Sequence, residues 1–181
     1  FQKAVDMADR LAREKNAIVT IGVKPTFPST GYGYIQFEDV QEKKFRGVYK
    51  VKTFAEKPHR QLAERFISSG DFLWNAGMFV WKVKVLLDGL KIHMPELYDS
   101  MKLISDRIKK GKEFEDIWRF IEPESIDYGL LEKVNNIFVI SCEFEWNDLG
   151  SWNALYDILG KDNNGNIIRG LGKVLSGENN F

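Results

Sequence analysis

Hydrophobic side chains recur at intervals of three and four residues along several stretches of the chain. This spacing places them on one face of a helix. The clearest example is the stripe formed by Leu97, Met101, Ile104 and Ile108. We expect these stripes to be buried in the core. The pattern predicts helices over residues 1–15, 59–69, 83–92, 96–109, 114–121, 125–133 and 152–159.

Shorter runs of β-branched and aromatic residues predict strands between these helices. The charged segment 38–44 joins two of the runs, which indicates a hairpin. Before that hairpin, residues 24–33 contain two prolines and two glycines and are expected to be irregular. The predicted strands are residues 17–23, 32–37, 45–54, 77–81 and 136–142.

The two ends of the chain show different patterns. The first helical stripe begins at Phe1 without a capping residue or an initiator Met, so we expect sequence upstream of it. Turn-forming residues fill 160–166, and two short strands are expected at 167–169 and 173–175. We therefore divide the chain into a main part, 1–160, and the start of a C-terminal β element or linker, 161–181.

The composition argues against some classes of binding partner. The 181 residues include 26 Lys and Arg and 26 Asp and Glu, so there is no overall electrostatic case for nucleic acid or an anionic membrane. A local basic patch is still compatible with this balance. No apolar stretch reaches the ~18 residues that span a bilayer, and no secretory signal is visible. The single cysteine, Cys142, lies in a predicted strand and is expected to be a small buried side chain in a cytoplasmic protein.

A carboxylate follows the last predicted strand. Asp148 lies just before Gly150, which permits a tight turn, and Ser151, which is placed to cap the next helix. Ligands of open α/β sheets bind at the carboxyl ends of strands, and an aspartate there is a natural Mg²⁺ ligand. Alternatively, Asp148 only caps or solvates a turn.

A pair of opposite charges ends the second strand of the hairpin. Glu56 can accept hydrogen bonds from vicinal hydroxyl groups, and Lys57 can hold a phosphate. Adjacent strand residues point to opposite faces, so these two side chains are not expected to pair with each other. The other interpretation is an ordinary solvated pair.

Two further positions suit a ligand. Gly33 lets a ligand approach the backbone closely, and the alternative is that its loop is only a rigid connector. Asn75 offers a donor and an acceptor together, as a sugar hydroxyl needs, although asparagine is also common in plain turns. Asp127 lies in the first turn of a predicted helix, where an acid is often only a partner of the helix dipole. His59 and His93 have no catalytic partner at a telling spacing and are expected at the surface.

The order of these motifs resembles the sugar-phosphate nucleotidyltransferases, and within that family the branch that joins mannose 1-phosphate to GTP. The resemblance covers roughly residues 1–170. The motifs that carry it are TGYGYI at 30–35, FAEKP at 54–58, WNAG at 74–77, SIDY at 125–128 and EWNDLGSW at 145–152. Two positions depart mildly from the pattern, Ala76 where Ser is frequent and Leu149 where Val is frequent.

The resemblance implies a Rossmann-like α/β fold, a mixed sheet flanked by helices, and the formation of GDP-mannose and pyrophosphate with Mg²⁺ as cofactor. It implies that Gly33, Glu56 and Asn75 bind the sugar. It further implies that Lys57 binds the sugar phosphate and that Asp148 is a Mg²⁺ ligand. We expect Glu56, Lys57, Asn75 and Asp148 to converge on one cavity at the rim of the sheet.

The Gly-rich loop, with its Arg and Lys, and the early Asp that the family uses for the nucleotide and the metal have no counterpart here. We therefore expect the 181 residues to be inactive alone. One alternative is a glucose-1-phosphate-type enzyme that uses UTP or dTTP. Another is a non-catalytic regulatory subunit that binds a sugar phosphate. The sequence is compatible with a homo-oligomer.

Overall fold

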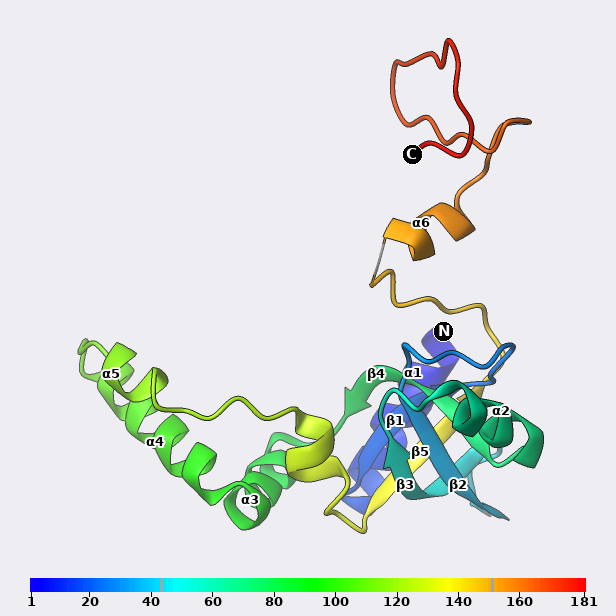
Figure 1. Cartoon of the computed structure of the whole chain (residues 1–181). Helices are drawn as coiled ribbons and strands as arrows, with labels where there is room; N and C mark the ends of the chain where they lie inside the picture. The colour runs from blue at the N-terminus through cyan, green and yellow to red at the C-terminus, as the bar shows by residue number, and fades with distance from the viewer. Residues whose placement is uncertain (43, 151) are drawn as a thin grey trace. The chain divides into compact units, whose positions relative to one another are not determined.

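The computed structural model describes residues 1–42, 44–150 and 152–181. These residues form two compact units, Phe1–Phe144 and Glu145–Phe181, which contain all the labelled elements of Figure 1. The boundary expected at residue 160 on sequence grounds stays a prediction. Ser151, which we expected to cap the last helix, lies outside the described residues.

The described part of the first unit contains five strands that close into a barrel in the order β1-β4-β2-β3-β5 (Figure 1). β1 pairs with β5 in parallel, from Ile18 opposite Ile137 onward, and the other neighbouring pairs are antiparallel. The strands are β1 (Ile18–Val23), β2 (Tyr34–Gln41), β3 (Val48–Ala55), β4 (Phe72–Val80) and β5 (Ile137–Cys142).

The predicted α/β class, with a mixed sheet and flanking helices, is confirmed, and so is the β2–β3 hairpin. Closure of the sheet differs from the open sheet that a Rossmann-like arrangement implies. It follows from the pairing of β5 with both β1 and β3, which leaves each of the described strands with two neighbours. Closure depends on contacts between residues far apart in sequence, which strand patterns do not encode.

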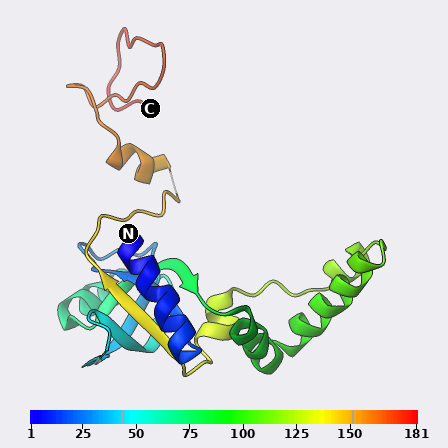
Figure 2. The same ribbon diagram turned by 180° about the vertical axis from the view of Figure 1, so that it is seen from behind.

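Helix α1 (Gln2–Lys15) covers one face of the sheet. It lies along β5 in Figure 2, and its buried residues are Ala4, Ala8, Leu11 and Ala12, as the sequence stripe predicts. Small side chains on this face let the helix approach the strands closely. Cys142 is buried in the same cluster, and its burial raises the pKa of the thiol, which disfavours the thiolate.

The alternate side chains of the strands form a second cluster with residues from the helical region. Ile35, Leu73 and Val139 meet Leu90 of α3 (Val83–His93) and Leu130 of the π-helix η1 (Asp127–Leu131). The predicted apolar face of residues 125–133 is therefore buried, and Ser125 Oγ accepts a hydrogen bond from the backbone of Tyr128, as a cap does.

Helices α4 (Pro95–Lys109) and α5 (Glu115–Trp118) lie beside each other away from the barrel in Figures 1 and 2. The structure describes every residue of α4, and none is buried. Met101, Ile108 and Trp118 are 45%, 57% and 64% exposed. The expectation that these two stripes form core is wrong, because α4 packs mainly on α3 and α5 and reaches the second core cluster only near its start, through Leu97 and Tyr98.

Helix α2 (Arg60–Ser69) follows β3. Its first turn is capped by His59, whose Nδ1 accepts a hydrogen bond from the backbone of Leu62 at 3.4 Å. The expected surface histidine therefore also has a structural contact. The helix ends at Gly70, whose φ of 78° is easily reached by glycine.

The second unit contains α6 (Trp152–Ile158) and a loop organised by polar side chains. Asp162 Oδ1 accepts hydrogen bonds from the backbone N–H groups of Asn164 and Asn166, and Asn166 bonds Asn180 in turn. The two short strands expected at 167–169 and 173–175 do not form in the described residues, because backbone groups here pair with loop residues rather than with a neighbouring strand. In the chain as described, no helix is long and apolar enough to cross a membrane.

Candidate functional site

Three of the predicted sugar-binding residues meet at one end of the β2–β3 hairpin. Gly33 immediately precedes β2 and lies beside β4, where its carbonyl oxygen accepts a hydrogen bond from Asn75 N at 2.8 Å. A Cβ atom placed on Gly33 would lie 2.6 Å from Glu56 Oε2 and 3.4 Å from the Cβ of Asn75. A side chain at position 33 would therefore displace the Glu56 carboxylate, and the grouping of Gly33, Glu56 and Asn75 is a feature of the folded unit.

A bulge in β4 sets the direction of Asn75. Opposite β1, the register shifts between the pairs Thr20–Phe79 and Gly22–Asn75, and Gly77 within the shift has a φ of 68°. Gly77 N donates a hydrogen bond to Asn75 Oδ1 at 3.1 Å. Bulges re-aim side chains next to functional sites, and this one holds the Asn75 amide beside Gly33.

Two residues that we did not predict as ligand contacts complete the surroundings of Asn75. Thr20 Oγ1, which is fully buried, lies 3.5 Å from Asn75 Oδ1, and Asn75 Nδ2 donates to Asp127 Oδ1 at 3.1 Å. The signal for Thr20 was a lone hydroxyl within an apolar strand. The signal for Asp127 was its motif, to which we had assigned no firm role. Asp127 thus acts on Asn75 from the start of η1.

Glu56 and Lys57 contact each other, contrary to our expectation. Lys57 Nζ lies 3.6 Å from Glu56 Oε1. The expectation is wrong because strand alternation ends at Ala55, and Lys57 adopts a left-handed φ of 44° that turns its side chain back. The Lys57 side chain is 65% exposed, so solvent screens this pair and its contribution to stability is small. The ammonium group therefore stays accessible to an anion.

Aromatic rings fix the irregular loop that leads to Gly33. Trp74 is buried and meets Phe27 and Tyr32 edge to face, at centroid distances of 4.8 and 5.1 Å. The hydroxyl of Tyr34 donates to the carbonyl of Ser29 at 2.9 Å. Edge-to-face contacts of this kind contribute about 0.5–1.5 kcal/mol beyond burial. These contacts hold the loop in an ordered conformation beside Gly33.

Asp148 belongs to the second unit. Its Oδ1 accepts a hydrogen bond from Gly150 N at 3.1 Å, and Asn147 Oδ1 accepts one from Leu149 N at 2.8 Å. Asp148 therefore caps a turn, as the simpler interpretation has it, and its side chain is exposed. Its convergence with Glu56, Lys57 and Asn75 stays a prediction.

The fit of a metal to these residues is limited. Within the described ranges, no three His, Cys, Asp or Glu side chains gather closely enough to hold an ion. Mg²⁺ is commonly held by one or two carboxylates together with water and phosphate oxygens. Asp148 fits the role of one such carboxylate, and the remaining ligands would have to come from the substrate, water and other residues.

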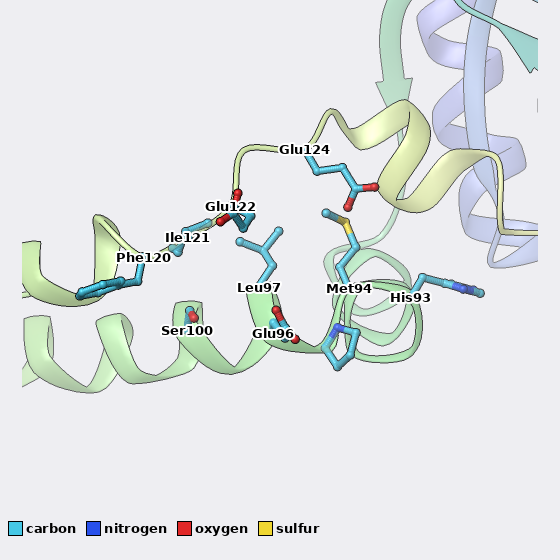
Figure 3. Close-up of a pocket in the computed structure, with 10 residues that line it drawn as sticks. His93, Met94, Glu96, Leu97, Ser100, Phe120, Ile121, Glu122 and Glu124 are labelled. Atoms are coloured by element: carbon cyan, nitrogen blue, oxygen red, sulfur yellow. The ribbon is translucent and has the colours of Figure 1, made fainter.

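A cavity of about 320 Å³ lies elsewhere, between the start of α4 and the segment that follows α5 (Figure 3). Glu96, Glu122 and Glu124 line it together with half-buried His93. Figure 3 shows Glu124 beside Met94, close to η1. None of the predicted site residues lines this cavity, so it is separate from the group around Asn75.

The chain resembles known proteins over most of its length. The family model described as nucleotidyl transferase matches residues 1–165. A putative mannose-1-phosphate guanylyltransferase of Vibrio cholerae is 37% identical over 99% of this chain and 38% of its own length. A mannose-1-phosphate guanylyltransferase of Klebsiella pneumoniae is 34% identical over 99% of this chain and 39% of its own length. The chain thus spans well under half the length of these relatives.

Solved structures show the same relationship. The crystal structure of mannose-1-phosphate geranyltransferase from Thermus thermophilus has a TM-score of 0.77 at 29% identity, over 94% of this chain and 48% of the other. The crystal structure of mannose-6-phosphate isomerase from Helicobacter pylori has a TM-score of 0.68 at 30% identity, over 81% of this chain and 58% of the other. With the family model covering nearly the whole sequence, the chain belongs to the nucleotidyl transferase family.

Proposed function

We propose that this chain forms the sugar-phosphate-binding part of a mannose-1-phosphate guanylyltransferase. The reaction is mannose 1-phosphate plus GTP giving GDP-mannose and pyrophosphate. The observation that carries the proposal is the meeting of Gly33, Glu56 and Asn75 beside the exposed ammonium group of Lys57. The names of the relatives support mannose and guanylyl transfer as the specific chemistry.

Each residue has a role that its surroundings favour. Asn75 Nδ2 carries a second hydrogen that Asp127 does not use, so it can donate to a sugar hydroxyl. Glu56, which is partly buried, can accept from neighbouring hydroxyls through its carboxylate. Lys57 offers a point charge for the sugar phosphate, and the Gly33 backbone lies open to close approach.

In the proposed reaction, an oxygen of the sugar phosphate attacks the α-phosphorus of GTP in line, and pyrophosphate leaves. Such a transfer depends on position and charge rather than on a protein nucleophile. Lys57 positions the attacking phosphate and partly neutralises it. Mg²⁺ is the proposed cofactor, spreading the charge that develops on the phosphates, and Asp148 would be one of its ligands. A cytoplasmic location is part of the same proposal.

The test is calorimetric titration of the chain, and of any longer protein in which it occurs, with mannose 1-phosphate. We expect Asn75→Ala and Glu56→Gln to weaken binding about tenfold or more, since each removes a hydrogen bond inside the site. Asn163→Ala, at an exposed turn, is the matched control and should bind normally. Equal affinity of all three variants for mannose 1-phosphate would overturn the assignment of the sugar site to Asn75 and Glu56. Titration with glucose 1-phosphate separates the two sugar classes.

Turnover tests the remainder of the proposal. We expect no GDP-mannose formation by the 181 residues alone, because they carry no Gly-rich phosphate-binding loop. The longer protein should form GDP-mannose with Mg²⁺ and prefer GTP over UTP and dTTP. Appreciable GDP-mannose formation by the 181 residues alone would refute the proposal that residues outside them bind the nucleotide.

A further inference from the structure

A strongly basic cavity lies between α1 and the turn of the β2–β3 hairpin. It has a volume of about 270 Å³. Four of its lining side chains are cationic and one is acidic. The lining residues are Lys3, Asp6, Met7, Arg10, Lys44, Phe45 and Arg46.

Phe45 organises the cations around this cavity. Its ring is almost fully buried, at 5% exposure, in the cluster that α1 covers. The Arg10 guanidinium carbon and the Lys44 ammonium nitrogen each lie 5.7 Å from the ring centroid. Cation–π contacts at exposed sites contribute about 0.5–1 kcal/mol each. The aromatic ring therefore holds two positive groups near the cavity without neutralising them.

Three of the four cations that line the cavity lack the ion-pair partners that other cations nearby possess. On the same helix, Arg13 pairs with Asp9 at 2.8 Å, and Lys15 pairs with Glu42 of the hairpin at 2.8 Å. Lys44 pairs with Glu14. In contrast, Lys3, Arg10 and Arg46 form no ion pair with any residue that the structure describes. The cavity therefore carries an excess of positive charge, with Asp6 as its one acidic lining residue.

The positive groups of the cavity also act on one another. Like charges repel by roughly 1 kcal/mol at 4 Å even in water. An anion in the cavity would relieve this repulsion.

We propose that this cavity binds a small phosphate-class anion with two or more negative charges. Arg10 comes from the helix and Arg46 from the hairpin turn. Each guanidinium group can donate two parallel hydrogen bonds to phosphate oxygens. The chain as a whole has no net charge, and the cations next to the cavity along α1 are paired. Three unpaired cations that line one cavity of about 270 Å³ suit a compact anion.

This site is distinct from the proposed sugar-phosphate site. Glu56 and Lys57 follow the last residue of β3, whereas Lys44 and Arg46 precede its first residue. At about 3.3 Å per residue, the eight residues of β3 separate the two groups by roughly 25 Å along the strand. The proposal rests on charge and geometry at the hairpin turn and does not depend on the identity of the sugar.

The experiment is calorimetric titration of the 181-residue chain with inorganic pyrophosphate at low salt. We expect one site, and a tenfold or greater loss of affinity in Arg10→Gln and in Arg46→Gln. Arg10→Lys, which keeps the charge but loses the paired donors, should show an intermediate loss. The control is Arg13→Gln, on the same helix but outside the cavity, which should bind pyrophosphate normally. Circular dichroism checks that each variant is folded.

Several results would overturn the proposal. These are an absence of saturable binding, equal losses in Arg13→Gln and Arg10→Gln, or a loss in Lys57→Gln with none in Arg46→Gln. Capture of the chain by phosphatidylserine vesicles without binding of free pyrophosphate would assign the cavity to a membrane surface instead. Failure here would leave mannose 1-phosphate binding at Asn75 untouched, so the two proposals fail separately.

Discussion

Gly33 illustrates how much of the candidate site depends on the absence of a side chain. Its φ lies outside the left-handed region, so flexibility is not the reason for glycine here. The reason is the carboxylate of Glu56, which occupies the position that a Cβ would need. A glycine in a sequence can serve either purpose, and only the neighbours in space distinguish them.

At this position we predict a loss of binding without a large loss of stability. In Gly33→Ala the new methyl group would displace the Glu56 carboxylate, which is the flexible end of a side chain. Affinity for mannose 1-phosphate should fall about tenfold or more, while the free energy of unfolding changes by less than ~1 kcal/mol. Calorimetry and urea denaturation measure the two quantities.

The matched control is Gly31→Ala in the same loop. A Cβ there meets its nearest neighbour, Ser29 Oγ, at 3.9 Å, which is an ordinary contact. It should bind mannose 1-phosphate like the original chain. Normal binding by Gly33→Ala would show that the Glu56 carboxylate is not positioned for the sugar.

Asp71 provides a prediction about pH. Hydrogen bonds from the Ser69 hydroxyl at 2.6 Å and the Gln36 amide at 2.7 Å lower the pKa of this carboxyl below its ordinary value of 3.8. A lowered folded-state pKa stabilises the fold above pH 3.8, and this stabilisation is lost as the pH falls further through the folded-state pKa. Asp71→Asn should therefore reduce the free energy of unfolding by about 1 kcal/mol at pH 7 and by progressively less below pH 3.8.

Urea denaturation at a series of pH values measures this difference. Asp99→Asn, an exposed aspartate on α4, is the control and should cost little at any pH. A cost for Asp71→Asn that stayed constant down to pH 2 would show that the carboxylate form is not what these hydrogen bonds stabilise.

At the scale of elements, α1 and α4 both carry an apolar helical stripe, but residues of the stripe are fully buried only in α1. The stripe of α1 faces a closed sheet and is buried, whereas that of α4 faces mainly α3 and α5 and reaches the core only near its start. Helical periodicity predicts that a helix has an apolar face, and it does so correctly for both. Whether that face is covered depends on what lies opposite, which periodicity does not contain.

This contrast predicts very different costs for substitutions in the helical region. Leu130→Ala, at a fully buried position of η1, should reduce the free energy of unfolding by about 2–5 kcal/mol because it leaves a cavity. Trp118→Ser should cost less than ~1 kcal/mol, since the indole is mostly exposed. Urea midpoints compare the two variants, and a cost for Trp118→Ser close to that of Leu130→Ala would mean that α5 is covered in solution.

At the scale of the whole molecule, the buried apolar residues are unevenly divided. Both core clusters lie entirely between Ala4 and Cys142, within the first unit. In the second unit, Ile167 is the one buried hydrophobic residue among those described. The first unit therefore has the contacts needed to fold without the second.

We accordingly expect a chain that ends after Phe144 to keep the unfolding midpoint of the longer one. Its circular dichroism should show the same cooperative transition, because no core residue has been removed. A chain that ends after Asn136 is the control: it lacks β5, which pairs with both β1 and β3, and should not fold. Loss of cooperativity after truncation at Phe144 would show that residues 145–181 contribute to the core.

The sequence by itself determined the types of most elements, the α/β class and the family. These depend on local spacing and on short motifs such as FAEKP and WNAG. The candidate residues Gly33, Glu56 and Asn75 were identified in the same way, and the structure brings them together. Periodicity and motifs involve neighbours a few residues apart, and these are directly readable.

Only the tertiary structure decided the closure of the sheet, the contact between Glu56 and Lys57, and the exposure of α4. The same holds for the approach of Thr20 and Asp127 to Asn75, and for the gathering of cations around Phe45. Each of these depends on which distant segments meet, or on a single backbone angle such as that of Lys57. Such contacts are fixed by the packing of the whole unit, so no local pattern in the chain contains them.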